Sequence, residues 1–148
     1  MPREVVWVTG ASAGIGKAIV EAYVADGAVV AATARPSERL DALAEEIPGP
    51  VDTQTIEVAD GASVEAAAKA VGEIDGLVYL AGVYWPQPAQ EWDAGQVEAM
   101  FDVNLTGAAR VLGQVVPGFV ARDRGHIVVT GSLSGFRGLP GAIGYGAS

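Results

Sequence analysis

Cysteine is absent from the 148-residue sequence, histidine occurs once, and no long apolar run is present. Without cysteine the chain forms no disulfide and no thiolate metal site, which fits a reducing compartment, so we expect a cytoplasmic protein. Crossing a bilayer takes roughly 18 or more successive apolar residues, so we expect no membrane partner. The start, Met1-Pro2-Arg3-Glu4, leads straight into a strand-like run, and a hydrophobic signal segment is not expected.

Basic residues are also scarce: 9 lysines and arginines stand against 18 acidic residues, which gives a net charge of −9. Proteins that bind nucleic acid concentrate lysine and arginine, so we expect no nucleic-acid partner. Solubility accounts for the acidic excess without a functional acidic surface. Half of the residues are hydrophobic, and a chain of this length can bury one sizeable core. We therefore predict a single domain over residues 1–148.

Short apolar runs alternate with helical patterns along the whole sequence. Most of the runs are continuously apolar, as in strands that are covered on both faces, so a parallel sheet is predicted. The order β-α-β-α-β-α-β-α-β with right-handed crossovers predicts an α/β fold, a three-layer doubly wound sheet that is Rossmann-like. The five predicted strands are Val5–Val8, Ala28–Ala32, Thr55–Val58, Leu77–Ala81 and Ile127–Val129.

Apolar residues at helical spacing predict four intervening helices. Gly27 would end the first helix, and Asp60 and Ser63 are candidate caps for the third. The longest irregular stretch, Tyr84 to about Ala94, is equally compatible with a functional loop and a plain surface connection. The four stripes are Ile15, Ala18, Ile19, Ala22 and Tyr23; Leu40, Leu43, Ala44 and Ile47; Val64, Ala67, Ala68 and Val71; and Val97, Met100, Phe101, Leu105, Ala108, Leu112, Val115 and Phe119.

A glycine-rich turn follows the first predicted strand. Glycine permits a tight turn and lets a pyrophosphate approach the N-terminus of the next helix, where free N–H groups and the helix dipole hold the anion. Three glycines are a weak signal alone, but here they stand between a strand and a helix at the start of a β-α-β unit, as the motif requires. We therefore predict a dinucleotide-binding turn formed by Thr9, Gly10, Ser12, Ala13, Gly14, Ile15 and Gly16.

The Gly-x-x-x-Gly-x-Gly spacing of this turn resembles the short-chain dehydrogenase/reductase family, whose turn has the form Thr-Gly-x-x-x-Gly-Ile-Gly. Three further matches follow in order: Asn104 in an Asn-x-x-Gly, Ser132 after the fifth strand, and Tyr145, thirteen positions later, as the tyrosine of Tyr-x-x-x-Lys. These motifs cover nearly the whole chain at the spacing of the family. The resemblance implies an oxidoreductase that transfers hydride between a nicotinamide and a small carbonyl or alcohol, and a homo-oligomer for the complete protein.

The choice between nicotinamide cofactors should depend on the end of the second strand. A carboxylate there would bind both ribose hydroxyls and favour NAD, but this chain has Ala34 followed by Arg35. A guanidinium suits a 2′-phosphate, so NADP(H) is favoured over NAD(H), with Arg39 as a possible second contact. The alternative is that Arg35 is only a solvated loop residue.

Two further segments are matched to the cofactor through the resemblance. The adenine-side acid of the family aligns with Glu57, beside Val58, while Asp60 is a candidate contact or only a helix cap. The family often has Asn-Asn-Ala-Gly after the fourth strand, whereas this chain has Tyr79-Leu80-Ala81-Gly82. Ala81 and Gly82 would still let the backbone pass close to the cofactor, without the two asparagine side chains.

The resemblance assigns the chemistry to Asn104, Ser132 and Tyr145. Hydride exchange needs a proton donor or acceptor beside the substrate oxygen, and Tyr145 is the candidate. Ser132 would polarise that oxygen, and Asn104 would carry a proton relay at a helix kink. Asn104 and Tyr145 would also contact the cofactor. The alternatives are a rim tyrosine, a capped polar turn and a buried hydrogen-bonding amide. Ser134 is a weaker candidate, and His126 has neither triad nor metal partners in the sequence. No metal site is expected.

The lysine of Tyr-x-x-x-Lys would be residue 149, beyond this sequence. A free tyrosine ionises near pH 10, and in the family the lysine lowers that pKa and holds the nicotinamide ribose. We therefore expect an incomplete fragment, truncated after the fifth strand, from which the C-terminal substrate-binding part is absent and whose isolated activity is uncertain. The alternative is a non-catalytic NADP(H)-binding module or sensor that is active only with a complementing chain.

Overall fold

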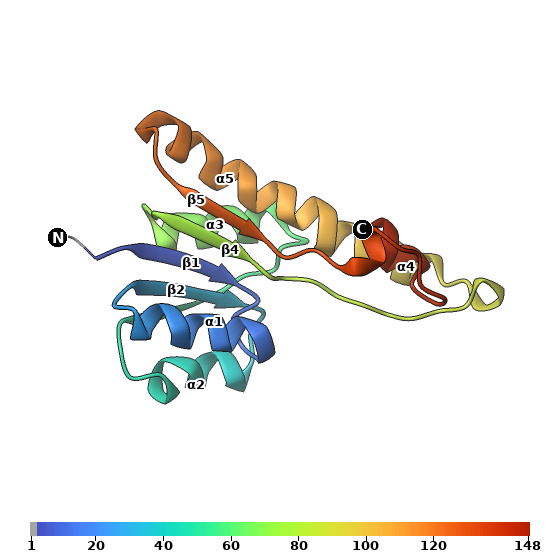
Figure 1. The fold of residues 1–148 in the computed structure, drawn as a ribbon, viewed down its shortest axis with the longest axis horizontal. Helices are drawn as coiled ribbons and strands as arrows, with labels where there is room; N and C mark the ends of the chain where they lie inside the picture. Colours follow the sequence, from blue (N-terminus) through green and yellow to red (C-terminus); the bar gives the residue numbers. More distant parts are fainter. Residues whose placement is uncertain (1–2) are drawn as a thin grey trace.

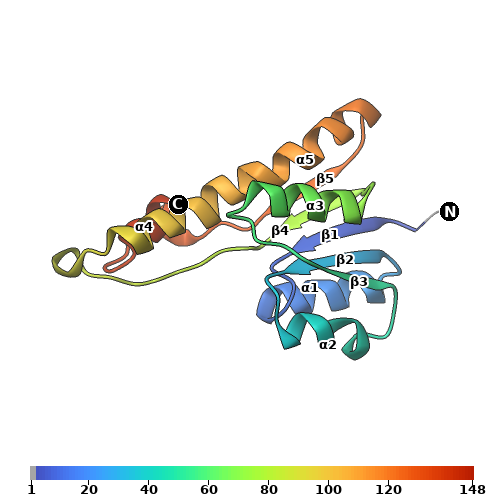
Figure 2. The same ribbon diagram turned by 180° about the vertical axis from the view of Figure 1, so that it is seen from behind.

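The computed structural model describes residues 3–148, in which a parallel sheet has the strand order β3-β2-β1-β4-β5. Its strands are β1 (Val5–Thr9), β2 (Val29–Ala34), β3 (Val51–Thr55), β4 (Gly76–Tyr79) and β5 (His126–Val129). Two helices, α1 (Gly14–Ala25) and α2 (Glu38–Glu46), cover one face, and α3 (Gly61–Val71) and α5 (Gly107–Arg122) cover the other (Figures 1 and 2). The predicted three-layer, doubly wound α/β architecture is confirmed.

The strands send alternate side chains into two separate cores, one on each face of the sheet. On β1, Trp7 packs in the core under α3 and α5, whereas Val6 and Val8 pack in the core under α1 and α2. Because both faces are covered, nearly every position of such a strand is apolar, which explains the continuous runs at β1 and β2; the exceptions, Thr9 and Thr33, are buried and hydrogen-bonded. The indole Nε1 of Trp7 donates a hydrogen bond of 2.8 Å to Oγ1 of Thr33, which is also fully buried.

Replacing Thr33 by valine should lower the free energy of unfolding by about 1–3 kcal/mol, since the buried indole N–H then loses its acceptor while the side-chain volume is kept. Urea unfolding monitored by far-UV circular dichroism measures the change. An unchanged midpoint and slope would contradict this account of the Trp7 environment.

The third strand begins four residues earlier than the sequence pattern predicts, at Val51–Thr55 rather than Thr55–Val58. It is an edge strand that pairs only with β2, so polar residues such as Asp52 are tolerated in it and conceal it. The apolar Ile56 and Val58 that suggested a strand are buried just beyond its end. The prediction was wrong because two buried residues in an extended connection resemble a short strand.

The buried face of α1 is rotated relative to the predicted stripe. Ile15 is 68% exposed, and Ala18 and Ala22 are exposed as well, whereas Gly16 and Val20 are buried. The helix is apolar around most of its circumference, so the spacing alone does not select one face. Close packing of Gly16 against the preceding turn selects it.

Other local predictions have mixed outcomes. Gly27, at φ 92°, follows the end of α1 as predicted. Asp60 caps α3 by accepting from the N–H of Ala62 at 3.0 Å, whereas Ser63 does not cap the helix and accepts from the N–H of Glu57 at 2.9 Å. Ala44, predicted to lie on the buried stripe of α2, is exposed.

The long helix predicted across Val97–Phe119 is divided into α4 (Ala94–Met100), a π-helical turn at Phe101–Thr106, and α5. The N–H of Gly107 bonds to the carbonyl of Asp102, five residues back. The wider turn rotates the apolar stripe, so Leu105 is 55% exposed. Asn104 lies in this turn, where the sequence predicts an interruption.

The segment between β4 and α4 extends away from the sheet beside the segment that leads from β5 to α6 (Ile143–Ala147) (Figures 1 and 2). The two segments are joined by a hydrogen bond of 2.9 Å from the N–H of Gln87 to the carbonyl of Gly141. Gln87 is itself buried, and its side chain accepts from the N–H of Asp93 at 2.6 Å. None of the helices within residues 3–148 has the length and apolar character to span a membrane.

Candidate active site

A cleft of about 920 Å³ opens at the carboxyl ends of the strands, beside β1, β2 and β4. The connection after β1 leads to α1 on one face of the sheet, whereas the connection after β4 leads to α4 and α5 on the other, so the cleft lies at the switch point where ligands bind in doubly wound folds. The predicted cofactor residues that line it are Gly10, Ser12, Ala13, Arg35, Glu57, Val58, Ala81 and Gly82. The sequence did not single out several further lining residues, namely Pro36, Ser37, Glu38, Ile56, Leu80, Val83 and Val103.

The glycine turn at the floor of the cleft fits a pyrophosphate. Gly10 and Gly14 adopt φ values of 71° and 55°, which favour glycine. A Cβ on Gly10 would lie 3.0 Å from backbone atoms of Leu80 and Ala81. Ala13 precedes α1 without a side-chain cap, and the first turn of the helix has no acidic residue. Its N–H groups and dipole therefore remain available to an anion.

Thr9 and Gly16 shape this turn from behind the cleft wall. Thr9 is fully buried, and its Oγ1 accepts hydrogen bonds from the N–H groups of Leu80 at 3.1 Å and Ala81 at 3.3 Å. A Cβ on Gly16 would overlap the carbonyl oxygen of Gly10. Neither residue lines the cleft, and neither do Gly14 and Ile15. The structure shows that Thr9 and Gly16 support the geometry of the turn, and their direct contact with a cofactor stays a prediction.

Arg35 and Arg39 both line the cleft beyond the end of β2, where Ala34 is buried. Within residues 3–148 neither guanidinium forms an ion pair. Ser37 lies between them and caps α2 by accepting from the N–H of Leu40 at 3.3 Å. Ser37 could have been predicted as a helix cap from the sequence, because it is a serine directly before a helical pattern.

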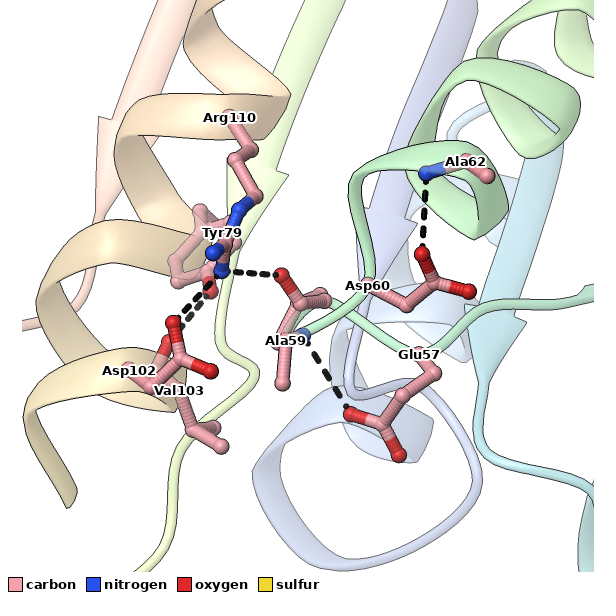
Figure 3. Close-up of polar contacts among 9 residues, drawn as sticks. Glu57, Ala59, Asp60, Ala62, Tyr79, Asp102, Val103 and Arg110 are labelled. Atoms are coloured by element: carbon pink, nitrogen blue, oxygen red, sulfur yellow. Dashed lines mark hydrogen bonds and ion pairs between the residues drawn. The ribbon is translucent and has the colours of Figure 1, made fainter. Parts of the chain in front are cut away.

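Glu57 lies across the cleft, after β3. Its carboxylate accepts from the N–H of Ala59 at 3.4 Å, as Figure 3 shows. Asp60 is turned towards Ala62 at the start of α3 and does not line the cleft (Figure 3). Of the two acids, Glu57 is therefore the one that lines the cleft, and Asp60 is a helix cap.

Asn104 uses its whole side-chain amide in hydrogen bonds. Its Oδ1 accepts from the N–H of Val83 at 2.7 Å, and its Nδ2 donates to the carbonyl of Val83 at 3.0 Å. The same Nδ2 donates to Oγ of Ser148 at 2.9 Å. The side chain thus joins the π-helical turn to the segment after β4, and a role in proton relay stays a prediction.

Ser132 follows the end of β5, and its Oγ accepts two hydrogen bonds from Ser134. One comes from the backbone N–H at 3.2 Å and the other from the Ser134 hydroxyl at 2.9 Å. Ser134 is buried, so this hydroxyl has a fixed partner. The sequence ranked Ser134 as a weak candidate, and the structure makes it the residue that orients Ser132.

Tyr145 lies in α6, which packs against the short turn Leu133–Gly135 that follows Ser132. Its ring is tilted by 43° against the ring of Tyr84, with 4.6 Å between the centroids. Tyr84 belongs to the irregular segment after β4, and nothing in the sequence singled it out as a neighbour of Tyr145. His126 opens β5 at the opposite end of the strand from this cluster.

A family model described as short chain dehydrogenase matches residues 4–148. The chain belongs to the short-chain dehydrogenase family. The chain is 37% identical over 149 residues to the NADP-dependent 3-hydroxy acid dehydrogenase YdfG of Salmonella typhimurium, a match that covers 97% of this chain and 60% of that protein. It is 31% identical over 153 residues to an uncharacterized oxidoreductase of Listeria monocytogenes, covering 99% and 62% respectively.

Solved structures of the family are similar to nearly the whole of this chain. A serine dehydrogenase complexed with NADP⁺ is 34% identical with a TM-score of 0.91, over 97% of this chain and 60% of that one. The actinorhodin polyketide ketoreductase with NADPH is 32% identical with a TM-score of 0.93, over 98% and 59%. The chain thus spans about 60% of the length of these relatives.

Proposed function

We propose that the cleft binds NADP(H), and that the whole protein transfers hydride between its nicotinamide and a small carbonyl or alcohol. The observation that carries this proposal is the pair of unpaired guanidinium groups, Arg35 and Arg39, in the same cleft as the uncapped N-terminus of α1. Glu38 lines the cleft beside the two arginines, so this end of the cleft has two positively charged side chains and one negatively charged side chain. Relatives whose names specify NADP or NADPH support the same choice.

The cleft offers a contact for each end of such a dinucleotide. The backbone of Gly10 and Ala13 would hold the pyrophosphate, and Arg35 with Arg39 would hold a 2′-phosphate through charge-assisted hydrogen bonds. Glu57 and Val58 would line the adenine side, while Ala81 and Gly82 leave room for close passage along the end of β4. A bound nicotinamide supplies or accepts the hydride.

The proposed chemistry uses Ser132 and Tyr145 on the substrate oxygen. Ser134 holds Ser132 Oγ through its backbone N–H at 3.2 Å and its hydroxyl at 2.9 Å, and a serine hydroxyl held in this way can donate to a carbonyl oxygen, which suits polarisation. Tyr145 would transfer the proton, and Tyr84 limits where its ring can move. We infer that residues 1–148 form a cofactor-binding domain, because the cleft that would hold the dinucleotide is lined by residues of several of their segments.

Titration of ¹⁵N-glycine-labelled chain with NADP⁺ tests the location of the site. The amide signals of Gly10, Gly14 and Gly16 should shift with saturation, because Gly10 lines the cleft and the other two belong to the same turn and the start of α1, while that of Gly113 in α5 should stay in place. Absence of a saturable shift at these three glycines would contradict the proposal. Binding without hydride transfer by the whole protein would favour a non-catalytic module.

A further inference from the structure

Tyr79 is a buried residue that takes no part in the proposed reaction. It ends β4 and is 2% exposed, and its phenol donates a hydrogen bond of 3.0 Å to the carbonyl of Val103 (Figure 3). Val103 lies in the π-helical turn immediately before Asn104. Within residues 3–148 the Tyr79 phenol forms one hydrogen bond, and its acceptor, Val103, is the residue directly before Asn104. The side-chain amide of Asn104 in turn binds the backbone of Val83.

Arg110 holds the same turn from α5. Its Nη1 donates to Oδ1 of Asp102 at 2.8 Å (Figure 3). The same Nη1 donates to the carbonyl of Val58 at 3.2 Å. Asp102 belongs to the π-helical turn, and Val58 belongs to the wall of the cleft. The turn is thus attached to β4 through Tyr79 and to the segment after β3 through Arg110.

These contacts depend on a close approach of the helix to the sheet. A Cβ on Gly107, directly after the turn, would lie 2.9 Å from Cγ2 of Val58 and 3.0 Å from the phenol oxygen of Tyr79. A π-helical turn is intrinsically unfavourable and occurs mostly as a single turn within an α-helix. It therefore needs support from outside the helix, and the phenol and the guanidinium provide it.

The phenol is a donor over the whole working pH range. Burial raises the pKa of Tyr79 well above its ordinary value, against a smaller opposite effect of Arg110. Because the neutral form persists, the hydrogen bond to Val103 does not switch with pH in the physiological range.

We propose that Tyr79 is a positioning residue, which fixes the π-helical turn through Val103 and so holds the Asn104 amide against the backbone of Val83, with Arg110 as its second support. Any influence of Tyr79 on hydride transfer rests on the proposed function, but its influence on the position of the Asn104 amide does not. Loss of the phenol leaves the Val103 carbonyl without this donor and frees the turn to relax towards ordinary α-helical geometry, which would rotate Asn104 away from Val83.

The sequence allows a direct test, because Asn104 is the only asparagine in the chain. Labelling with ¹⁵N-asparagine gives a single pair of side-chain amide signals, which reports its hydrogen bonds to Val83 and Ser148. In Tyr79→Phe the ring is kept and the hydroxyl is lost. We expect these signals to move towards the values of a free amide and their hydrogen exchange to become about tenfold faster.

Thr33→Val is the matched control, because it also removes a buried hydrogen bond but on β2, away from the turn. It should leave the Asn104 signals in place even though it lowers stability. Unchanged Asn104 signals in Tyr79→Phe, or an equal change in Thr33→Val, would overturn the proposal. If Tyr79→Phe fails to fold, Arg110→Met replaces it in the test, because Arg110 is a partly exposed support of the same turn. The Asn104 signals should then move in Arg110→Met and stay in place in Thr33→Val, and the opposite results would overturn the proposal. No cofactor is present, so the result is independent of NADP(H) binding.

Discussion

Gly16→Ala should abolish NADPH binding and lower the free energy of unfolding by about 3 kcal/mol or more, at or above the upper end of ordinary overpacking. The reason is that a methyl group on Gly16 overlaps the Gly10 carbonyl oxygen and lies 2.9 Å from Cα of Ala11. These are backbone atoms, which cannot move aside as a flexible side chain does. The helix N-terminus would therefore be displaced from the turn that is proposed to hold the pyrophosphate. Urea unfolding and an NADPH fluorescence titration measure the two effects.

Gly113→Ala is the control for this substitution. Gly113 lies in α5, and a Cβ there meets nothing within 4 Å. Alanine in a helix interior should raise stability by roughly 0.5–1 kcal/mol and leave NADPH affinity unchanged. A Gly16→Ala chain that unfolds and binds like the parent chain would contradict the close packing described for α1.

Arg35→Ala should weaken NADPH binding by about 10- to 100-fold, the range expected for lost hydrogen bonds to a charged group, and should leave NADH binding nearly unchanged. Only NADPH carries the 2′-phosphate that the guanidinium would bind. Parallel fluorescence titrations with the two nucleotides give the ratio directly.

Arg137→Ala removes the same charge from an exposed position outside the cleft. It controls for the general effect of charge on an anionic ligand and should change neither affinity by more than about twofold. Equal losses for both nucleotides in Arg35→Ala would instead assign Arg35 to general charge attraction and not to the 2′-phosphate.

The sequence predicted those features that depend on local pattern. Continuous apolar runs such as Val5–Val8 predicted strands covered on both faces, and the Gly10–Gly16 turn predicted the cleft because its geometry requires glycine. The second strand was predicted as Ala28–Ala32 and ends two residues later, at Ala34, and Arg35 follows it into the cleft. The structure of these segments is determined mainly by the residues within each segment.

Features that depend on contacts between distant segments could not be predicted. The polar edge strand β3 is stabilised by pairing with β2, and its own residues gave a misleading signal at Ile56 and Val58. The contact of Tyr79 with Val103 spans 24 positions, and the tilted ring contact of Tyr84 with Tyr145 spans still more. Such pairs appear only when the sheet and the π-helical turn are placed together.

A side-by-side titration of the unmodified chain with NADPH and NADH tests the central claim most directly. Both nucleotides share the pyrophosphate, the adenine and the nicotinamide, so the ratio of their dissociation constants isolates the 2′-phosphate. The arrangement of Arg35 and Arg39 predicts that NADPH binds at least about tenfold more tightly, and that added salt reduces the difference. Equal affinities, or tighter binding of NADH, would contradict the account.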